Sequence, residues 1–124
     1  MSEWKGDKII SDQDLVNDTI ETEYPIMCES IEAITLEMFN LFKRKQADYG
    51  PTNIGMGNSI IETDKDIHRS MIGLVVRMND KVQRLMNLIL DNKDPQNESV
   101  EDTLIDIANY AVMAQLVINK EWGK

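Results

Sequence analysis

A Ser/Thr-x-x-Asp tetrapeptide stands directly before three runs of helically spaced apolar residues, and this pattern constrains the fold more than any other. The tetrapeptides begin at Ser11, Thr63 and Ser99. The side chain of the first residue can accept a hydrogen bond from the backbone N–H three residues on, and the acidic residue can bond back to the cap. The pattern therefore predicts helices over about 12–22, 64–90 and 100–120.

A fourth helix is indicated by the stretch from Pro25 to about Ala47, which contains no glycine and no further proline. Proline suits the first turn of a helix, and Gly50-Pro51 is typical of a helix end. The apolar residues of this stretch form one helical stripe: Met27, Ile31, Ile34, Met38, Leu41 and Phe42.

These patterns predict an all-α fold, with a bundle of three long helices and a short N-terminal helix. The expected organisation is an N-terminal segment over 1–24, with the short helix, followed by a single all-α domain over 25–124. The second half of the last helix is apolar on nearly all sides, and one chain of this length cannot surround it. We therefore expect association into a homodimer or homotetramer to complete the bundle.

The charge balance excludes several partners, because 13 Lys and Arg face 22 Asp and Glu, for a formal net charge of −9. Such a chain repels duplex nucleic acid and anionic membrane surfaces. No apolar run approaches the roughly 20 residues of a membrane span, and no signal peptide is recognisable. The single cysteine, Cys28, rules out an internal disulfide. We expect a cytoplasmic protein with no membrane or duplex partner.

Asp102, Asp106 and Asn109 share one stripe of the last predicted helix, at spacings of four and three residues. Met113 and Val117 continue the stripe, so we expect it to be partly buried. Buried carboxylates are costly unless they are paired or bound to metal, and carboxylate and amide oxygens suit Mg²⁺ or Mn²⁺. Asp102 also stands at the third position of a capping box, so capping alone explains it equally well.

Two further carboxylates are candidates, Glu37 at the edge of an apolar stripe and Asp80 between Arg77 and Arg84. Carboxylates from facing helices can converge on one or two metal ions. The alternative for Asp80 is an ion pair within its own helix, worth a few tenths of a kcal/mol.

A cationic set, Arg77, Lys81 and Arg84, shares one face of the same predicted helix as Asp80. Guanidinium groups grip phosphate oxygens with two parallel bonds, and lysine adds a point charge. Three cations beside carboxylates are what a metal–triphosphate site requires, although a solvated charged face would look the same.

The loop over 48–58 separates the first and second long helices and is rich in polar residues and glycine. Tyr49 could stack on a base, and no Walker or dinucleotide-binding pattern is present. An ordinary helix stop is the alternative reading of the loop. Its polar candidates are Asp48, Tyr49, Asn53 and Asn58.

Three strings, KRKQADYG over 43–50, GLVVRMNDKVQRLMNL over 73–88 and ESVEDTLIDIANYAV over 98–112, resemble a phage and bacterial family. This is the nucleotide-modification-associated domain of the all-α NTP pyrophosphatase superfamily, which includes the MazG-like and dimeric dUTPase-like proteins. The resemblance covers about residues 30–118.

The resemblance implies an all-α oligomer that uses Mg²⁺ to cut a nucleoside triphosphate to monophosphate and pyrophosphate. It assigns Asp102 and Asp106 to one acidic pair and Asp80 to the facing helix, all as metal ligands. Better-known members carry Glu-x-x-Glu and Glu-x-x-Asp pairs, which this chain lacks in that form. The family's basic and substrate-contacting positions fall on Lys45, Asp48, Tyr49, Arg77, Lys81 and Arg84.

The leading hypothesis is therefore a Mg²⁺-dependent (or Mn²⁺-dependent) nucleotide pyrophosphohydrolase of a bacterial cell or a phage. Asp80 and Asp106, with Glu37, would do the catalysis, and Asn109 would help to hold base or sugar. A metal-bound water would attack phosphorus while the cations neutralise the phosphates. One alternative is a phage protein that binds and sequesters a nucleotide signal without cutting it. Another is a structural helical protein whose charged stripes are solvated.

Overall fold

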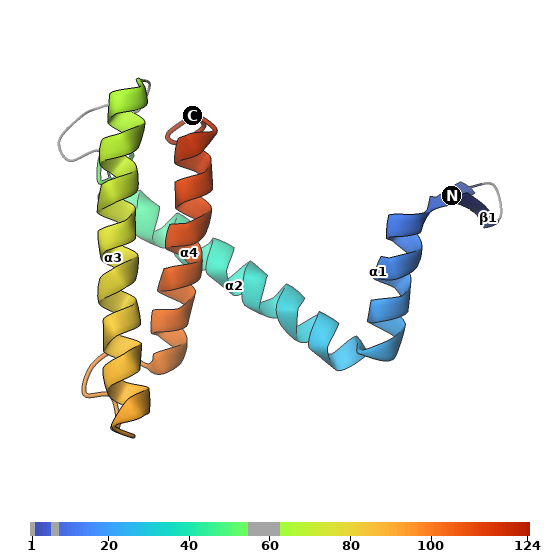
Figure 1. Cartoon of the computed structure of the whole chain (residues 1–124), viewed down its shortest axis with the longest axis horizontal. Helices are drawn as coiled ribbons and strands as arrows, with labels where there is room; N and C mark the ends of the chain where they lie inside the picture. Colours follow the sequence, from blue (N-terminus) through green and yellow to red (C-terminus); the bar gives the residue numbers. More distant parts are fainter. Residues whose placement is uncertain (1, 6–7, 55–62) are drawn as a thin grey trace. The chain divides into compact units, whose positions relative to one another are not determined.

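The computed structural model describes residues 2–5, 8–54 and 63–124 and confirms the all-α fold (Figure 1). Its four helices follow a short antiparallel hairpin at the N-terminus. The elements are β1 (Ser2–Lys5), β2 (Lys8–Ser11), α1 (Asp12–Glu23), α2 (Pro25–Tyr49), α3 (Asp64–Leu90) and α4 (Val100–Ile118). The described part of the chain divides into two compact units, Met1–Glu37 and Met38–Lys124.

The helix starts lie where the capping patterns predict them. The side chains of Ser11, Thr63 and Ser99 each accept a hydrogen bond from the backbone N–H three residues on. At Thr63 the box is reciprocal, because the Asp66 carboxylate accepts from the Thr63 backbone N–H at 3.2 Å. These bonds satisfy N–H groups that the first helical turn leaves without partners.

The first unit contains the hairpin, α1 and the beginning of α2. The hairpin, which the sequence patterns did not predict, pairs Ser2 with Ser11 and Lys5 with Lys8. Neither α1 nor α2 contains a buried residue. Several apolar side chains of this unit are therefore open to solvent, including Ile26 at 79% exposed.

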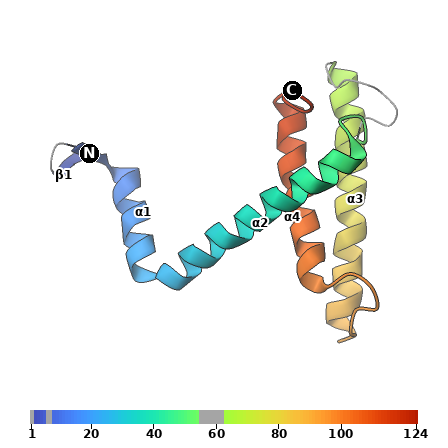
Figure 2. The same cartoon turned by 180° about the vertical axis from the view of Figure 1, so that it is seen from behind.

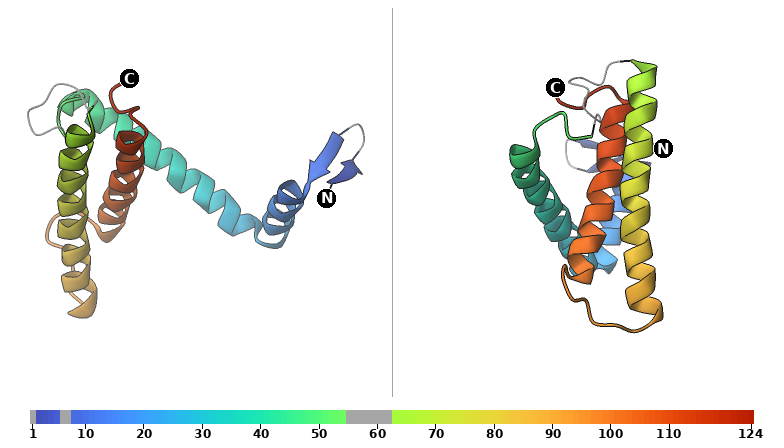
Figure 3. Two further views of the ribbon diagram at one scale, coloured as in Figure 1. Left: turned by 45° about the horizontal axis from the view of Figure 1, so that its top comes forward. Right: turned by 90° about the vertical axis from the view of Figure 1, so that its left-hand side faces the viewer.

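The second unit contains the end of α2, together with α3 and α4. Helices α3 and α4 run side by side in opposite directions (Figure 2). Helix α4 lies between α3 and the C-terminal half of α2 (Figure 3, right). Helix α4 can therefore present side chains to both neighbours.

The core of the second unit is small and lies mainly between α3 and α4. Its buried members are Ile54, Leu74, Met113, Ala114, Val117 and Trp122. The last helix is not buried on all sides within one chain, as its apolar pattern and the short chain predict, because Val112 is 48% and Ile118 57% exposed. No helix in the described part of the chain is long and apolar enough to cross a membrane.

Candidate functional site

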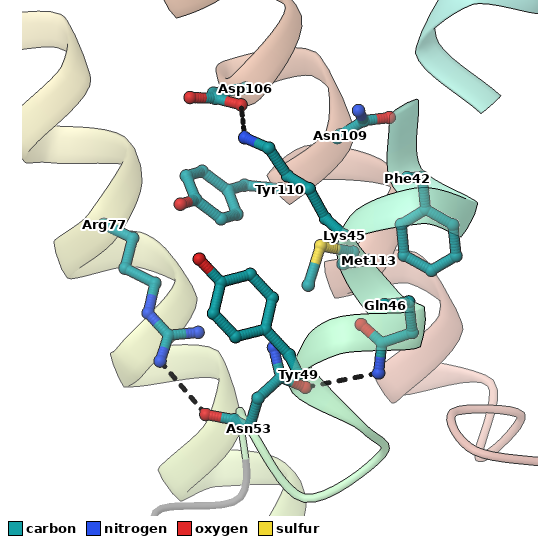
Figure 4. Close-up of a pocket in the computed structure, with 10 residues that line it drawn as sticks. All are labelled: Phe42, Lys45, Gln46, Tyr49, Asn53, Arg77, Asp106, Asn109, Tyr110 and Met113. Atoms are coloured by element: carbon teal, nitrogen blue, oxygen red, sulfur yellow. Dashed lines mark hydrogen bonds and ion pairs between the residues drawn. The ribbon is translucent and has the colours of Figure 1, made fainter. Parts of the chain in front are cut away.

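A cavity of about 300 Å³ opens in the second unit between the end of α2, the middle of α3 and the middle of α4 (Figure 4). Its size is at the lower end of what small-molecule sites offer. Its wall combines two cations, one carboxylate, three amides and three aromatic rings. The lining residues are Phe42, Lys45, Gln46, Tyr49, Asn53, Arg77, Asp106, Asn109, Tyr110 and Met113.

Among the described residues, Asp106 is the only carboxylate in this wall, and it is paired with two lysines. Its residue is 8% exposed, and its two oxygens each lie 2.9 Å from an ammonium, Lys45 Nζ from α2 and Lys81 Nζ from α3. Lys81 Nζ lies 2.9 Å from a Glu98 carboxylate oxygen as well. A chain of charge-assisted hydrogen bonds thus joins the three helices at the inner end of the pocket.

The pKa shifts of Asp106, Lys45 and Lys81 all favour the charged form of the group. Burial acts to raise the pKa of the Asp106 carboxyl, but the hydrogen bonds from the Lys45 and Lys81 ammonium groups outweigh it and hold the pKa below its ordinary value. The bond to Asp106 raises the pKa of Lys45 against a smaller effect of burial. Burial acts to lower the pKa of Lys81, and its bonds to Glu98 and Asp106 reverse that effect.

The turn after α2 forms the outer wall and is fixed by two side chains. An Arg77 guanidinium N–H donates to the Asn53 carbonyl oxygen at 3.1 Å. The Gln46 amide donates to the Gly50 carbonyl at 2.5 Å and to Asn53 Oδ1 at 3.3 Å. Gly50 has a φ of +74°, which few other residues adopt without strain. Tyr49, which is 65% exposed, precedes this turn, and its side chain lines the pocket (Figure 4).

Asn109 lies one turn of α4 after Asp106 and contacts α2. Its amide donates to the Met38 carbonyl oxygen at 3.2 Å. Asp106, Asn109 and Met113 line the pocket together, as their spacing on one stripe predicts.

The other predicted site residues lie outside this wall. Asp48, Asp80 and Asp102 are exposed, and Glu37 is exposed in the first unit. The Asp102 backbone N–H bonds the Ser99 side chain, which is the capping arrangement. Lys81 is paired with Asp106 but does not line the pocket. Arg84 bonds the Thr103 hydroxyl and the Glu98 carbonyl, tying α3 to the start of α4. Asn58 falls outside the described residues.

A divalent ion needs several oxygen ligands close together. Among residues 2–5, 8–54 and 63–124 no three His, Cys, Asp or Glu side chains are grouped closely enough to hold one. Asp106, the carboxylate that lines the pocket, already contacts two ammonium groups. Their positive charge opposes the binding of a divalent cation at the same oxygens. The carboxylates of the described residues therefore do not form a Mg²⁺ site within a single chain.

Several residues at the site were not predicted from the sequence. Glu98 stands before a helix cap and looks like part of a polar turn, although it precedes Asp106 by eight residues, about two helical turns. Gln46, which holds the outer wall, has no chemistry that would single it out. The aromatic and thioether side chains in the wall read as core residues: Phe42, Tyr110 and Met113.

Residues 45–118, more than half of the chain, match the family described as nucleotide modification associated domain 1. The chain belongs to this family. The match begins at Lys45 and includes every pocket residue except Phe42. The link to the MazG-like superfamily is not part of this match and stays a prediction.

The wider comparisons add no relative. No curated protein and no solved structure matches the chain.

Proposed function

We propose that the pocket binds a nucleotide through its phosphate and its base, without a metal site built from one chain. The observation that supports this most is the wall itself, in which Lys45 and Arg77 stand beside two tyrosines and three amides in a chain of net charge −9. Locally concentrated cations in an acidic protein are the feature expected of an anion-binding site. The family description, which concerns nucleotide modification, agrees with this chemistry.

The phosphate is expected at Lys45 and Arg77. The Lys45 side chain is 48% exposed, so its ammonium can reach a ligand while it stays near Asp106. Arg77 uses one N–H group on the Asn53 carbonyl, which leaves further donors of its fork for a phosphate oxygen. Asp106 opposes the anion, but its pairing with two lysines compensates its charge.

The base is expected against the tyrosines. Tyr49 and Tyr110 come from α2 and α4 and offer their rings to the same space (Figure 4). Base–aromatic stacking is worth about 1–3 kcal/mol per base and tolerates different bases. The amides of Gln46, Asn53 and Asn109 can supply the hydrogen bonds that distinguish one base from another.

The Mg²⁺-dependent pyrophosphohydrolase is the second candidate, and one observation favours it. Glu98 Oε1 is buried without a hydrogen-bond partner among the described residues, next to the pair of Lys81 and Asp106. An unpaired buried carboxylate oxygen costs stability and would gain from a cation or donor. Asp80 and Asp102 are exposed on the single chain, so they would join such a site only where copies associate, as a homodimer or homotetramer.

Mass spectrometry and thermal melting with ribo-, deoxy- and cyclic nucleotides separate the two candidates. Each nucleotide is incubated with the protein in Mg²⁺, in Mn²⁺ and in a chelator. Binding alone predicts a higher melting temperature, in metal and in chelator alike, and recovery of intact nucleotide. Hydrolysis predicts monophosphate and pyrophosphate that appear only with metal and vanish in Asp106→Asn. If no nucleotide raises the melting temperature or is cleaved, both candidates are wrong.

A further inference from the structure

We propose that Trp122, which lies outside the pocket, is a positioning residue that holds the pocket's outer wall in place for the ligand. This inference rests on the proposed nucleotide binding. Trp122 is 5% exposed, and its indole Nε1–H donates to the Pro51 carbonyl oxygen at 2.8 Å. Pro51 stands between Tyr49 and Asn53, two residues of the wall.

The Trp122 ring also contacts the pocket wall from behind. Its centroid lies 6.0 Å from that of Phe42, with an angle of 72° between the rings, which is a favourable edge-to-face arrangement. A second hollow lies behind the pocket and is lined by Phe42, Gln46, Pro51 and Trp122, among others. Phe42 and Gln46 line both spaces, so one layer of side chains separates the pocket from the space that Trp122 borders.

The chain reversal after α4 brings Trp122 to this position. Lys120 has a φ of 58°, its N–H bonds the Val117 carbonyl at 3.0 Å, and the Glu121 N–H bonds the Leu116 carbonyl at 2.9 Å. Such paired bonds around a left-handed residue end a helix and turn the chain back. Gly123 then passes so close to Pro51 that an added Cβ would lie 3.4 Å from the proline Cβ.

The turn over 50–54 is therefore held from two sides. Arg77 and Gln46 bond it from the pocket side, and Trp122 bonds it from the opposite side. Arg77 and Gln46 are also expected to contact the ligand, so they cannot fix the turn independently of it. The indole N–H is a support that ligand binding does not compete for, and it keeps Tyr49 and Asn53 preorganised.

The test uses the full chain and ATP and UTP as probes. Trp4, in the first unit, is the only other tryptophan, so Trp4→Phe leaves one indole N–H resonance, from Trp122. We expect this resonance to shift when either probe saturates the protein, although Trp122 does not line the pocket. Trp122→Phe keeps a ring but removes the donor, and we expect it to weaken probe binding about three- to tenfold, the effect of one hydrogen bond.

A matched variant separates positioning from plain destabilisation. Leu88→Val reduces a core residue of α3 that does not line the pocket, and it should lower the melting temperature without changing probe affinity. If wild-type protein binds a probe while the indole resonance stays fixed and Trp122→Phe binds equally well, the role of Trp122 is overturned and nucleotide binding stands. If the wild-type chain binds neither probe nor any other nucleotide of the panel, nucleotide binding fails first, and this inference falls with it.

Discussion

Asp102 and Asp106 stand one helical turn apart on the same stripe of α4, yet they occupy opposite environments. Asp102 is exposed in the capping turn, and Asp106 is buried between two lysines of the facing helices. The turn that carries Asp102 is tied to α3 through Arg84, which bonds Thr103. The turn that carries Asp106 faces both α2 and α3.

Helical spacing selects a face of a helix but not the partners that this face meets. Both carboxylates satisfy the same i, i+4 pattern, and both match the resemblance to acidic metal pairs. Only the facing helices decide that one is a cap residue and the other is part of a charged cluster. Substituting one carboxylate at a time therefore tests each environment separately.

Replacing Asp106 by Asn should have the largest effect on the stability of the protein. It removes the negative charge between two partly buried ammonium groups, and we expect a loss of about 2 kcal/mol in the free energy of unfolding. Asp102→Asn should cost no more than about 0.5 kcal/mol, because it affects only a carboxylate near a helix N-terminus. Urea denaturation of the two variants measures both values. Equal losses would contradict the contrast.

The same contrast on α2 concerns Lys45 and Lys43, two residues apart. Lys45 reaches into the pocket, and Lys43 lies 4.4 Å from the centroid of the Phe39 ring, on an exposed part of the helix. We expect Lys45→Ala to weaken nucleotide binding about tenfold through the loss of one phosphate contact, and Lys43→Ala to leave it unchanged. Isothermal titration of both variants measures the affinities. A tenfold loss of affinity in Lys43→Ala would show that the phosphate does not bind at Lys45.

The pH dependence gives the smallest expected effect across neutral pH. The pKa of Asp106 is lowered from 3.8, so its stabilisation is complete above that value and is lost as the pH falls through the lower folded-state pKa. The pKa values of Lys45 and Lys81 are raised from 10.5. The stability that these two groups contribute is therefore complete below pH 10.5 and is lost as the pH rises through the higher folded-state pKa.

The three groups should therefore contribute a constant amount of stability between about pH 5 and pH 9. Urea midpoints from pH 3 to pH 9 measure this. The Asp106→Asn variant should lose less stability than the wild-type chain as the pH falls. The Asp102→Asn variant should lose as much stability as the wild-type chain. A stability that changes steeply near pH 7 in the wild-type chain would contradict these charge states.

The sequence predicts the helices well because their signals are local. Caps at Ser11, Thr63 and Ser99 act on backbone groups only three residues away, and the starts of α1, α3 and α4 follow from them. The N-terminal hairpin was not predicted, because four-residue strands carry too short a pattern to distinguish them from a polar segment.

The pocket could be predicted only in part. Lys45, Tyr49, Arg77, Asp106 and Asn109 were proposed as site residues, and all five line one cavity. Their grouping depends on contacts between residues far apart in the chain, such as Lys45 with Asp106. Glu98 and Trp122 were missed for the same reason, since what matters about each is a partner that only the packed helices supply.

The small core has a consequence for the heat capacity of the protein. The heat capacity change on unfolding grows with the apolar surface that becomes hydrated, and ordinary domains show about 12–15 cal/mol/K per residue. Here the buried apolar set of the described residues is short, while Ile72, Val75 and Ile89 of α3 are more than half exposed. We therefore expect the lone chain to have a small heat capacity change on unfolding and a weakly curved plot of unfolding free energy against temperature.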